Sequence, residues 1–130
     1  MKKVAFICVH NSCRSQIAEA LGKRFYSNFF ECYSAGTEIK NEINKDAVRN
    51  LERMYSIDMM KSQYPKLIKD IPQCDIYISM GCNVTCPRIP GAKIYNWGLE
   101  DPTGKDDRFF ISVIKEIEYK LENLKRELSN

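Results

Sequence analysis

The sequence predicts an α/β fold, a single-domain three-layer sandwich in which a four-stranded, mainly parallel sheet carries helices on both faces. The first observation behind this prediction is the alternation of short apolar runs with longer segments whose apolar residues recur every three or four positions. The second is the order of these segments: strand, helix, strand, helix, strand, strand, helix. The third is size, because 130 residues, 44% of them hydrophobic, suffice for one domain over residues 1–130 with one core.

The first strand and helix are the most clearly marked elements. Residues 4–9 form a run of six apolar residues, VAFICV, typical of a buried parallel strand. A polar turn, His10-Asn11-Ser12, follows this run. From Ser15 onward the apolar residues are spaced four apart, which predicts one face of a helix. That face consists of Ile17, Leu21 and Phe25.

Three further strands and two further helices follow. The strands are expected at three short apolar runs, residues 29–34, 74–80 and 93–97. Asn44 is a suitable N-cap for the second helix, whereas residues 56–72 are weakly patterned. The last helix covers residues 108–128, and its apolar residues share one face. These residues are Phe110, Val113, Ile114, Ile117, Leu121, Leu124 and Leu128.

Composition and charge exclude several classes of function. The net charge is only +3 and no block of like charges occurs, so nucleic acid is not an expected partner. The start, Met1-Lys2-Lys3 followed by an apolar run, superficially resembles a secretion signal. However, the run is too short and meets His10-Asn11 where a cleavage site would need small residues. No stretch is long and apolar enough for a membrane span. We therefore expect a cytoplasmic protein. We also expect it to be a monomer.

Six cysteines are present, at positions 8, 13, 32, 74, 82 and 86. In a reducing compartment they are expected to be free thiols, some buried and some reactive. Cys32 and Cys74 lie in strand-like runs, where a free cysteine acts as a small hydrophobic residue. Cys13 precedes Arg14, and the structural interpretation is favoured for it as well.

The loop between the first strand and the first helix has the length of an anion cradle. Backbone N–H groups of such a loop can converge in front of the helix N-terminus. Arg14 can close the cradle with two parallel hydrogen bonds to an oxyanion. Cys8, at the end of the strand, lies beneath the anion in a field that favours the thiolate. The pattern therefore predicts a nucleophile aimed at a bound tetrahedral oxyanion.

Other segments should meet this cradle, because ligands of parallel sheets bind beyond the carboxyl ends of the strands. The segment after the third strand starts with Gly81-Cys82, and the segment after the fourth contains Asp101. The loop after the second strand, with Ser34, should join them. A carboxylic acid at position 101 could donate a proton to a leaving oxygen. Alternatively, Asp101 caps a turn that begins at Pro102.

Cys82 and Cys86 frame three residues and precede Pro87. In a helical or turned segment, two cysteines four apart can approach the Cα separation of about 5.5 Å that a disulfide needs. Their spacing is not that of a zinc knuckle, and the sole histidine, His10, belongs to the anion loop. We therefore do not expect a zinc site. More generally, we predict no required metal and no bound cofactor.

The segment CVHNSCRSQ, residues 8–16, resembles the signature loop of the low-molecular-weight protein tyrosine phosphatases. More closely, it is similar to the thioredoxin-coupled arsenate reductases built on that fold. The resemblance continues through YSAG (33–36), MGCNVTCP (80–87) and WGLEDPTGK (97–105), and so spans essentially the whole chain. The features that favour the reductases are the Cys82/Cys86 pair, Gln16 where phosphatases usually carry proline, and Thr103-Gly104 where they usually carry tyrosines.

The resemblance implies a reaction in which Cys8 attacks bound arsenate and Asp101 protonates the departing oxygen. Ser15 would stabilise the Cys8 thiolate. Cys82 would then attack Cys8 and release arsenite, Cys86 would attack Cys82, and external thioredoxin would reduce the Cys82–Cys86 disulfide. Phosphate or sulfate would mimic the substrate. Asn11 and Ser34 would orient the loop, and the oxyanion would be bound by Val9, His10, Asn11, Ser12, Cys13 and Arg14.

Two other functions compete with this one. A phosphatase acting on phosphotyrosine or a small phosphate ester needs only Cys8, Arg14 and Asp101, and leaves Cys82 and Cys86 unexplained. A phosphocysteine carrier module of a sugar transport system also places a cysteine after its first strand. Such a carrier does not need Arg14 or Asp101.

Overall fold

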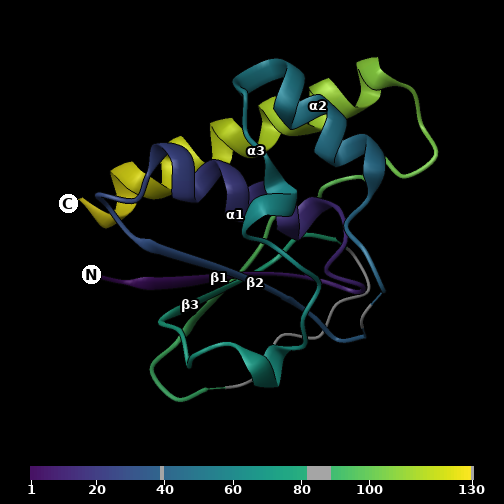
Figure 1. The fold of residues 1–130 in the computed structure, drawn as a ribbon. Coiled ribbons are helices and arrows are strands. Elements are labelled where there is room, and N and C mark those ends of the chain that lie inside the picture. Colours follow the sequence, from purple (N-terminus) through teal and green to yellow (C-terminus); the bar gives the residue numbers. More distant parts are fainter. Residues whose placement is uncertain (39, 82–88, 130) are drawn as a thin grey trace.

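The computed structural model describes residues 1–38, 40–81 and 89–129. Its centre is a sheet of four strands in the order β2-β1-β3-β4 (Figure 1). All three strand pairings are parallel, in agreement with the predicted fold class. The strands are β1 (Lys3–Cys8), β2 (Glu31–Gly36), β3 (Ile76–Ser79) and β4 (Lys93–Asn96).

Three α-helices cover one face of this sheet, and Figure 1 shows them on the same side. They are α1 (Arg14–Phe25), α2 (Lys45–Tyr55) and α3 (Asp107–Leu128). Val4 and Phe6 of β1 point into the core that these helices enclose. Ala5 and Ile7, which alternate with them, belong to a smaller cluster on the opposite face, as expected for a strand buried on both sides.

Helices were predicted on both faces of the sheet, but all three α-helices lie on one face. The second face is covered by loop segments and by η2 (Ile68–Asp70), a single 3₁₀ turn visible below the sheet in Figure 1. A second 3₁₀ turn, η1 (Met59–Lys61), follows α2. Both 3₁₀ turns fall in the weakly patterned segment, where the apolar spacing is insufficient to support a longer helix.

Local sequence signals explain where the helices begin. The side chain of Asn44 accepts a hydrogen bond from the backbone N–H of Ala47 at 3.0 Å, so it caps α2 as predicted. Asp106 caps α3 in the same way through Phe109 N–H at 2.9 Å. Phe25 differs from the prediction, because its side chain is 46% exposed and packs edge-on against the ring of Tyr55.

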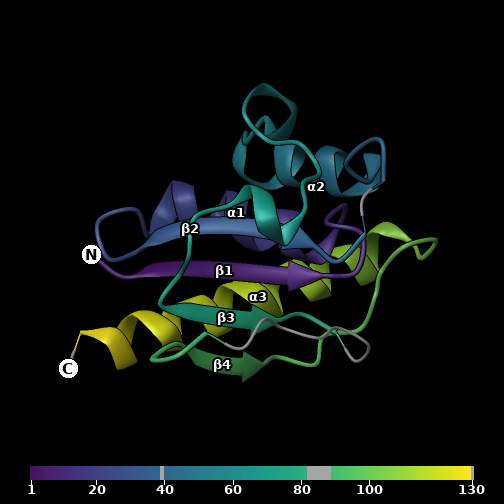
Figure 2. The same ribbon diagram turned by 90° about the horizontal axis from the view of Figure 1, so that it is seen from below.

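The parallel arrangement brings the carboxyl ends of β1, β3 and β4 to one edge of the sheet, as the arrowheads in Figure 2 show. Hydrogen bonds extend this alignment beyond the strands: Met80 N–H donates to Ile7 O at 2.8 Å, and Leu99 N–H donates to Met80 O at 2.9 Å. Ser34, predicted in the loop after the second strand, instead lies inside β2, paired with Phe6. No helix among the described residues has the length and apolar character needed to cross a bilayer.

Candidate active site

The loop from Cys8 to Arg14 joins the end of β1 to the first residue of α1. Asn11 adopts the left-handed backbone conformation, with φ of 52°, which asparagine tolerates better than most residues. Two hydrogen bonds hold the outside of the loop: Glu38 N–H donates to Val9 O at 2.9 Å, and Asn44 N–H donates to Ser12 O at 2.7 Å. The loop therefore has one fixed curvature at the N-terminus of a helix, as an anion cradle requires.

The side chain of Asn11 fixes this loop from inside. It is fully buried, and all of its hydrogen-bonding capacity is used. Its Nδ2 donates to Ser15 Oγ at 2.9 Å and to Ser34 Oγ at 3.0 Å. Its Oδ1 accepts from Gln16 Nε2 and from Lys66 N–H, both at 2.9 Å. Asn11 and Ser34 are thus brought together where the sequence predicts loop-orienting residues.

Cys8 and Ser15 are in direct contact, with 2.7 Å between Sγ and Oγ, and both are buried. The surrounding network decides which of them donates. The Ser34 hydroxyl donates its hydrogen to Glu19, so its oxygen accepts a hydrogen bond from Asn11 Nδ2. The Ser15 hydroxyl oxygen also accepts a hydrogen bond from Asn11 Nδ2. Within the described part of the chain, the Cys8 sulfur is then the acceptor left for the Ser15 hydroxyl hydrogen. The Ser15 hydroxyl is therefore placed to donate a hydrogen bond to the sulfur that the sequence predicts as the nucleophile.

Glu19, the charged group beneath this network, was not predicted from the sequence. The Glu19 carboxylate is 2% exposed and contacts Lys23, Ser34 and Lys66, with Lys66 Nζ at 3.3 Å. A buried carboxylate of this kind is stable only when it is paired and hydrogen-bonded. The signal that could have identified it is its position one helical turn after Ser15 and one turn before Lys23, on the buried side of α1.

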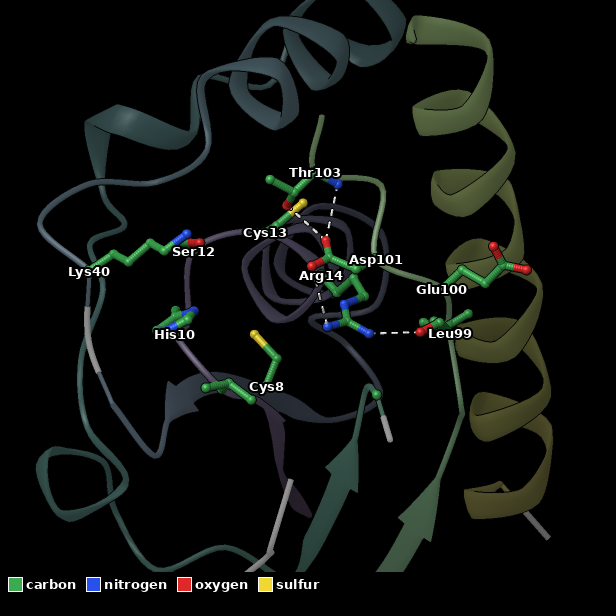
Figure 3. A pocket seen from close by; sticks show the side chains of 12 residues that line it. Cys8, His10, Ser12, Cys13, Arg14, Lys40, Leu99, Glu100, Asp101 and Thr103 are labelled. Atoms are coloured by element: carbon green, nitrogen blue, oxygen red, sulfur yellow. Dashed lines mark hydrogen bonds and ion pairs between the residues drawn. The ribbon is translucent and has the colours of Figure 1, made fainter. Parts of the chain in front are cut away.

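A cavity of about 460 Å³ opens above the loop (Figure 3). Arg14 and Asp101 both face it, as Figure 3 shows. Arg14 Nη1 donates to Leu99 O at 2.7 Å, and Nη2 lies 3.9 Å from Asp101 Oδ2. A Cβ atom on Gly81 would lie 2.2 Å from Arg14 Nη1, so a side chain at this position would displace the guanidinium. The lining residues are Cys8, Val9, His10, Ser12, Cys13, Arg14, Lys40, Gly81, Leu99, Glu100, Asp101 and Thr103.

Asp101 caps a turn and also lines the cavity. Its Oδ1 accepts hydrogen bonds from Thr103 N–H at 3.0 Å and Thr103 Oγ1 at 2.7 Å, which is the predicted turn cap. Its Oδ2 is left on the side of Arg14 and the cavity. Partial burial would raise the pKa of this carboxyl, but the two hydrogen bonds from Thr103 and the charges of Arg14 and Lys40 lower it overall. Asp101 is therefore ionised at neutral pH when the cavity holds no anion.

The cysteines divide into different environments. Cys32 and Cys74 are buried away from the cavity, and burial raises their pKa values to about 12 and about 11. Cys13 precedes α1 and lines the cavity; burial, together with nearby Asp101 and Cys8, raises its pKa to about 12. Cys82 and Cys86, predicted to form the disulfide relay, lie outside the described residues. Among residues 1–38, 40–81 and 89–129, no cluster of three or more histidine, cysteine or acidic side chains could hold a metal ion.

This division predicts selective alkylation. Iodoacetate at mildly alkaline pH should modify Cys8 faster than Cys13, Cys32 or Cys74, whose raised pKa values keep them protonated. Inorganic phosphate should protect Cys8 by occupying the loop. Peptide mapping by mass spectrometry distinguishes these thiols. Cys32 and Cys74 lie far from Cys8 in the sequence, and fragmentation of one peptide resolves Cys8 from Cys13. Equal labelling of Cys8 and Cys13, or indifference to phosphate, would contradict the proposed anion cradle.

Comparison with known proteins agrees with this geometry. Residues 3–130 match the family described as low molecular weight phosphotyrosine protein phosphatase. An arsenate reductase from Staphylococcus xylosus is 35% identical over 130 residues, covering 95% of this chain and 96% of the relative. A solved arsenate reductase in the phosphate binding state has a TM-score of 0.86 at 32% identity, covering 98% of this chain and 99% of that one.

A thioredoxin-dependent arsenate reductase from Corynebacterium glutamicum gives a TM-score of 0.79 at 35% identity, covering 99% of this chain and 62% of that one. The match to the family runs from β1 to α3 and includes the loop from Cys8 to Arg14 as well as Asp101. Since sequence and fold agree over nearly its entire length, this chain belongs to the low molecular weight phosphotyrosine protein phosphatase family.

Proposed function

We propose that this protein is an arsenate reductase that converts arsenate to arsenite and is recycled by thioredoxin. The observation that carries the proposal is the contact of Cys8 with Ser15 at the base of a cavity that Arg14 and Asp101 also line. This arrangement supplies a nucleophile, an anion-binding group and an acid for one tetrahedral oxyanion. Full-length relatives named arsenate reductase support arsenate as that oxyanion.

The first step forms a bond between sulfur and arsenic. Arsenate lies on the loop, with its oxygens toward the backbone N–H groups and the Arg14 guanidinium. The Cys8 thiolate attacks the arsenic atom, and one oxygen leaves as water after taking a proton from Asp101. Because the free Asp101 carboxyl has a lowered pKa, the negative charge of the bound arsenate must raise that pKa in the complex.

The second stage moves two electrons from sulfur to arsenic. The Cys82 thiolate attacks the Cys8 sulfur, the sulfur–arsenic bond breaks with its electron pair on arsenic, and arsenite leaves. A Cys8–Cys82 disulfide remains. Cys86 then attacks Cys82 and frees the Cys8 thiolate, and the dithiol of thioredoxin reduces the resulting Cys82–Cys86 disulfide. Gly81, the neighbour of Cys82 in sequence, lines the cavity, which supports an attack from this side.

The compartment and the assembly state are part of the same proposal. We place the protein in the cytoplasm as a monomer, organised as a single domain over residues 1–130. The supply of reduced thioredoxin and the need for free thiols both favour a reducing compartment. Among the described residues, Cys8, Cys13, Cys32 and Cys74 are free thiols, which supports a reducing compartment.

The direct test is arsenite production with thioredoxin, thioredoxin reductase and NADPH. The parent protein should turn over many times, whereas Cys82→Ser and Cys86→Ser should lose thioredoxin-coupled turnover because each interrupts the relay. Cys74→Ser is the matched control, since Cys74 is a buried thiol away from the cavity. Arsenite formation by both relay variants at the parent's rate would overturn the proposed relay, and no arsenite from the parent would overturn the proposed function.

A phosphatase is the second candidate, because Cys8, Arg14 and Asp101 are also sufficient for hydrolysis through a phosphocysteine. The cavity lining argues against aryl phosphates as the preferred substrates: no aromatic side chain contributes to it among the described residues. Hydrolysis of p-nitrophenyl phosphate by the same preparation tests this candidate. It should be weak and unchanged in Cys82→Ser and Cys86→Ser. A carrier function is disfavoured, since it would leave Arg14 and Asp101 without a role.

A further inference from the structure

The charges around the cavity do not balance when an oxyanion is bound. Arg14 is the cation that closes the loop, but its guanidinium already donates to Leu99 O and lies 3.9 Å from the Asp101 carboxylate. The Cys8 thiolate and a doubly charged oxyanion add further negative charge at the same place. Glu100 also lines the cavity, and the side chain of His10 lies 3.3 Å from the carboxylate oxygen Oε2 of Glu38.

Among the described residues of the lining, Lys40 is the other lysine or arginine. It is exposed, and it has no hydrogen bond or close ion pair with any other described residue. Figure 3 shows its side chain extending toward Ser12, on the side of the cavity opposite Arg14 and Asp101. Its charge acts across the cavity, because it contributes to lowering the pKa of Asp101. An ammonium group without a local counterion at the mouth of an anion site is placed to attract the anion.

We propose that Lys40 is the second cationic group of the oxyanion site, which attracts and binds the doubly charged oxyanion on the side away from Arg14. Because it names a further binding residue for the same substrate, this inference rests on the proposed function. Lys40 would favour a small inorganic dianion over a singly charged ligand of similar size. It would act on binding and not on bond breaking, since the leaving oxygen faces Asp101.

The simplest alternative is that Lys40 is an ordinary solvated lysine. Two alkylating reagents of nearly the same size separate these possibilities without any reductase assay. Iodoacetate is an anion and iodoacetamide is neutral, and both react with the Cys8 sulfur. In Lys40→Met the ratio of the iodoacetate rate to the iodoacetamide rate should fall by about 3- to 10-fold, the range expected for a partly screened charge at the rim of a cavity.

The same variant should bind inorganic phosphate about 3- to 10-fold more weakly, measured by protection of Cys8 from iodoacetamide. Lys40→Arg should retain both properties, because it keeps the charge. Lys115→Met, an exposed lysine of α3 that does not line the cavity, is the matched control and should behave like the parent. With arsenate, Lys40→Met should raise KM by a similar factor and leave kcat within about 2-fold.

An unchanged reagent ratio and unchanged phosphate protection in Lys40→Met would overturn the inference, and so would equal effects of Lys115→Met. These readouts remain valid if the protein produces no arsenite. In that case the proposed function fails, while the binding measurements still decide whether Lys40 belongs to the oxyanion site. Circular dichroism should be unchanged in all three variants, because both lysines are exposed.

Discussion

Replacing Cys8 by serine should abolish arsenite production, a loss of more than about 10⁴-fold in turnover. Serine is nearly the size of cysteine, but its hydroxyl is not ionised at neutral pH, and it can form neither the sulfur–arsenic bond nor a disulfide with Cys82. The same substitution should abolish any phosphatase activity, because both reactions begin with the same nucleophile.

The oxyanion loop should keep its conformation in Cys8→Ser. The loss of arsenite production can therefore be assigned to the missing nucleophile. The loop is held by Asn11 and by backbone hydrogen bonds to Val9 and Ser12, none of which involves the sulfur. Phosphate binding to Cys8→Ser, measured by calorimetry, should therefore stay within about 3-fold of the parent, or become tighter because a negative charge is removed. Residual arsenite production at a measurable rate would refute the role of Cys8 as nucleophile.

Asp101→Asn should have the second largest effect, lowering turnover about 10²- to 10⁴-fold. Asparagine offers the same oxygen to Thr103 N–H and Thr103 Oγ1, so the turn that Asp101 caps should remain intact. Asparagine cannot, however, donate the proton that the departing oxygen needs. Turnover measured with arsenate at saturation reports this loss, and Thr103→Val, which removes one hydrogen bond to Asp101, is a suitable control with a much smaller expected effect.

Phosphate binding by Asp101→Asn should change in the opposite direction from turnover and become tighter. The Asp101 carboxylate is ionised in the free protein because its pKa is lowered, so it repels an incoming oxyanion. Asp101→Asn removes this repulsion and should bind phosphate more tightly than the parent. Slower chemistry combined with tighter binding distinguishes loss of an acid from a damaged site. Weaker phosphate binding together with slower turnover would indicate structural damage instead.

Much of the fold could be predicted because its strongest signals are local. The apolar face predicted for residues 108–128 matches α3, with Phe110 and Leu121 both buried. The strand order was not derivable from these signals, and the layers proved unequal because residues 56–72 form only two 3₁₀ turns. Phe25 illustrates a further limit: its spacing fits the apolar face, but α1 ends there and the side chain remains 46% exposed.

The part of the site that could be predicted follows from strand direction. Cys8 and Asp101 each follow or end a parallel strand, and such ends meet at one edge of a sheet. The supporting residues could not be found in this way. Gln16 and Gln63 illustrate the difficulty, because Gln63 Nε2 donates to Gln16 Oε1 at 2.7 Å from a segment with no periodic pattern. Contacts between residues this far apart in sequence depend on packing, and no local spacing indicates them.

The attachment of Arg14 to the carbonyl oxygens of Met80 and Leu99 has a consequence for the order of events in the cycle. The guanidinium proposed to bind the ligand is thus also bonded to the segments that follow β3 and β4, directly beside Gly81. By thermodynamic reciprocity, any shift of residues 80–81 that alters these attachments must change affinity for the ligand, and ligand departure must act equally on those residues. In the proposed relay, where the chain after Gly81 carries Cys82, loss of the ligand and approach of that thiol would therefore be energetically coupled, and one could time the other.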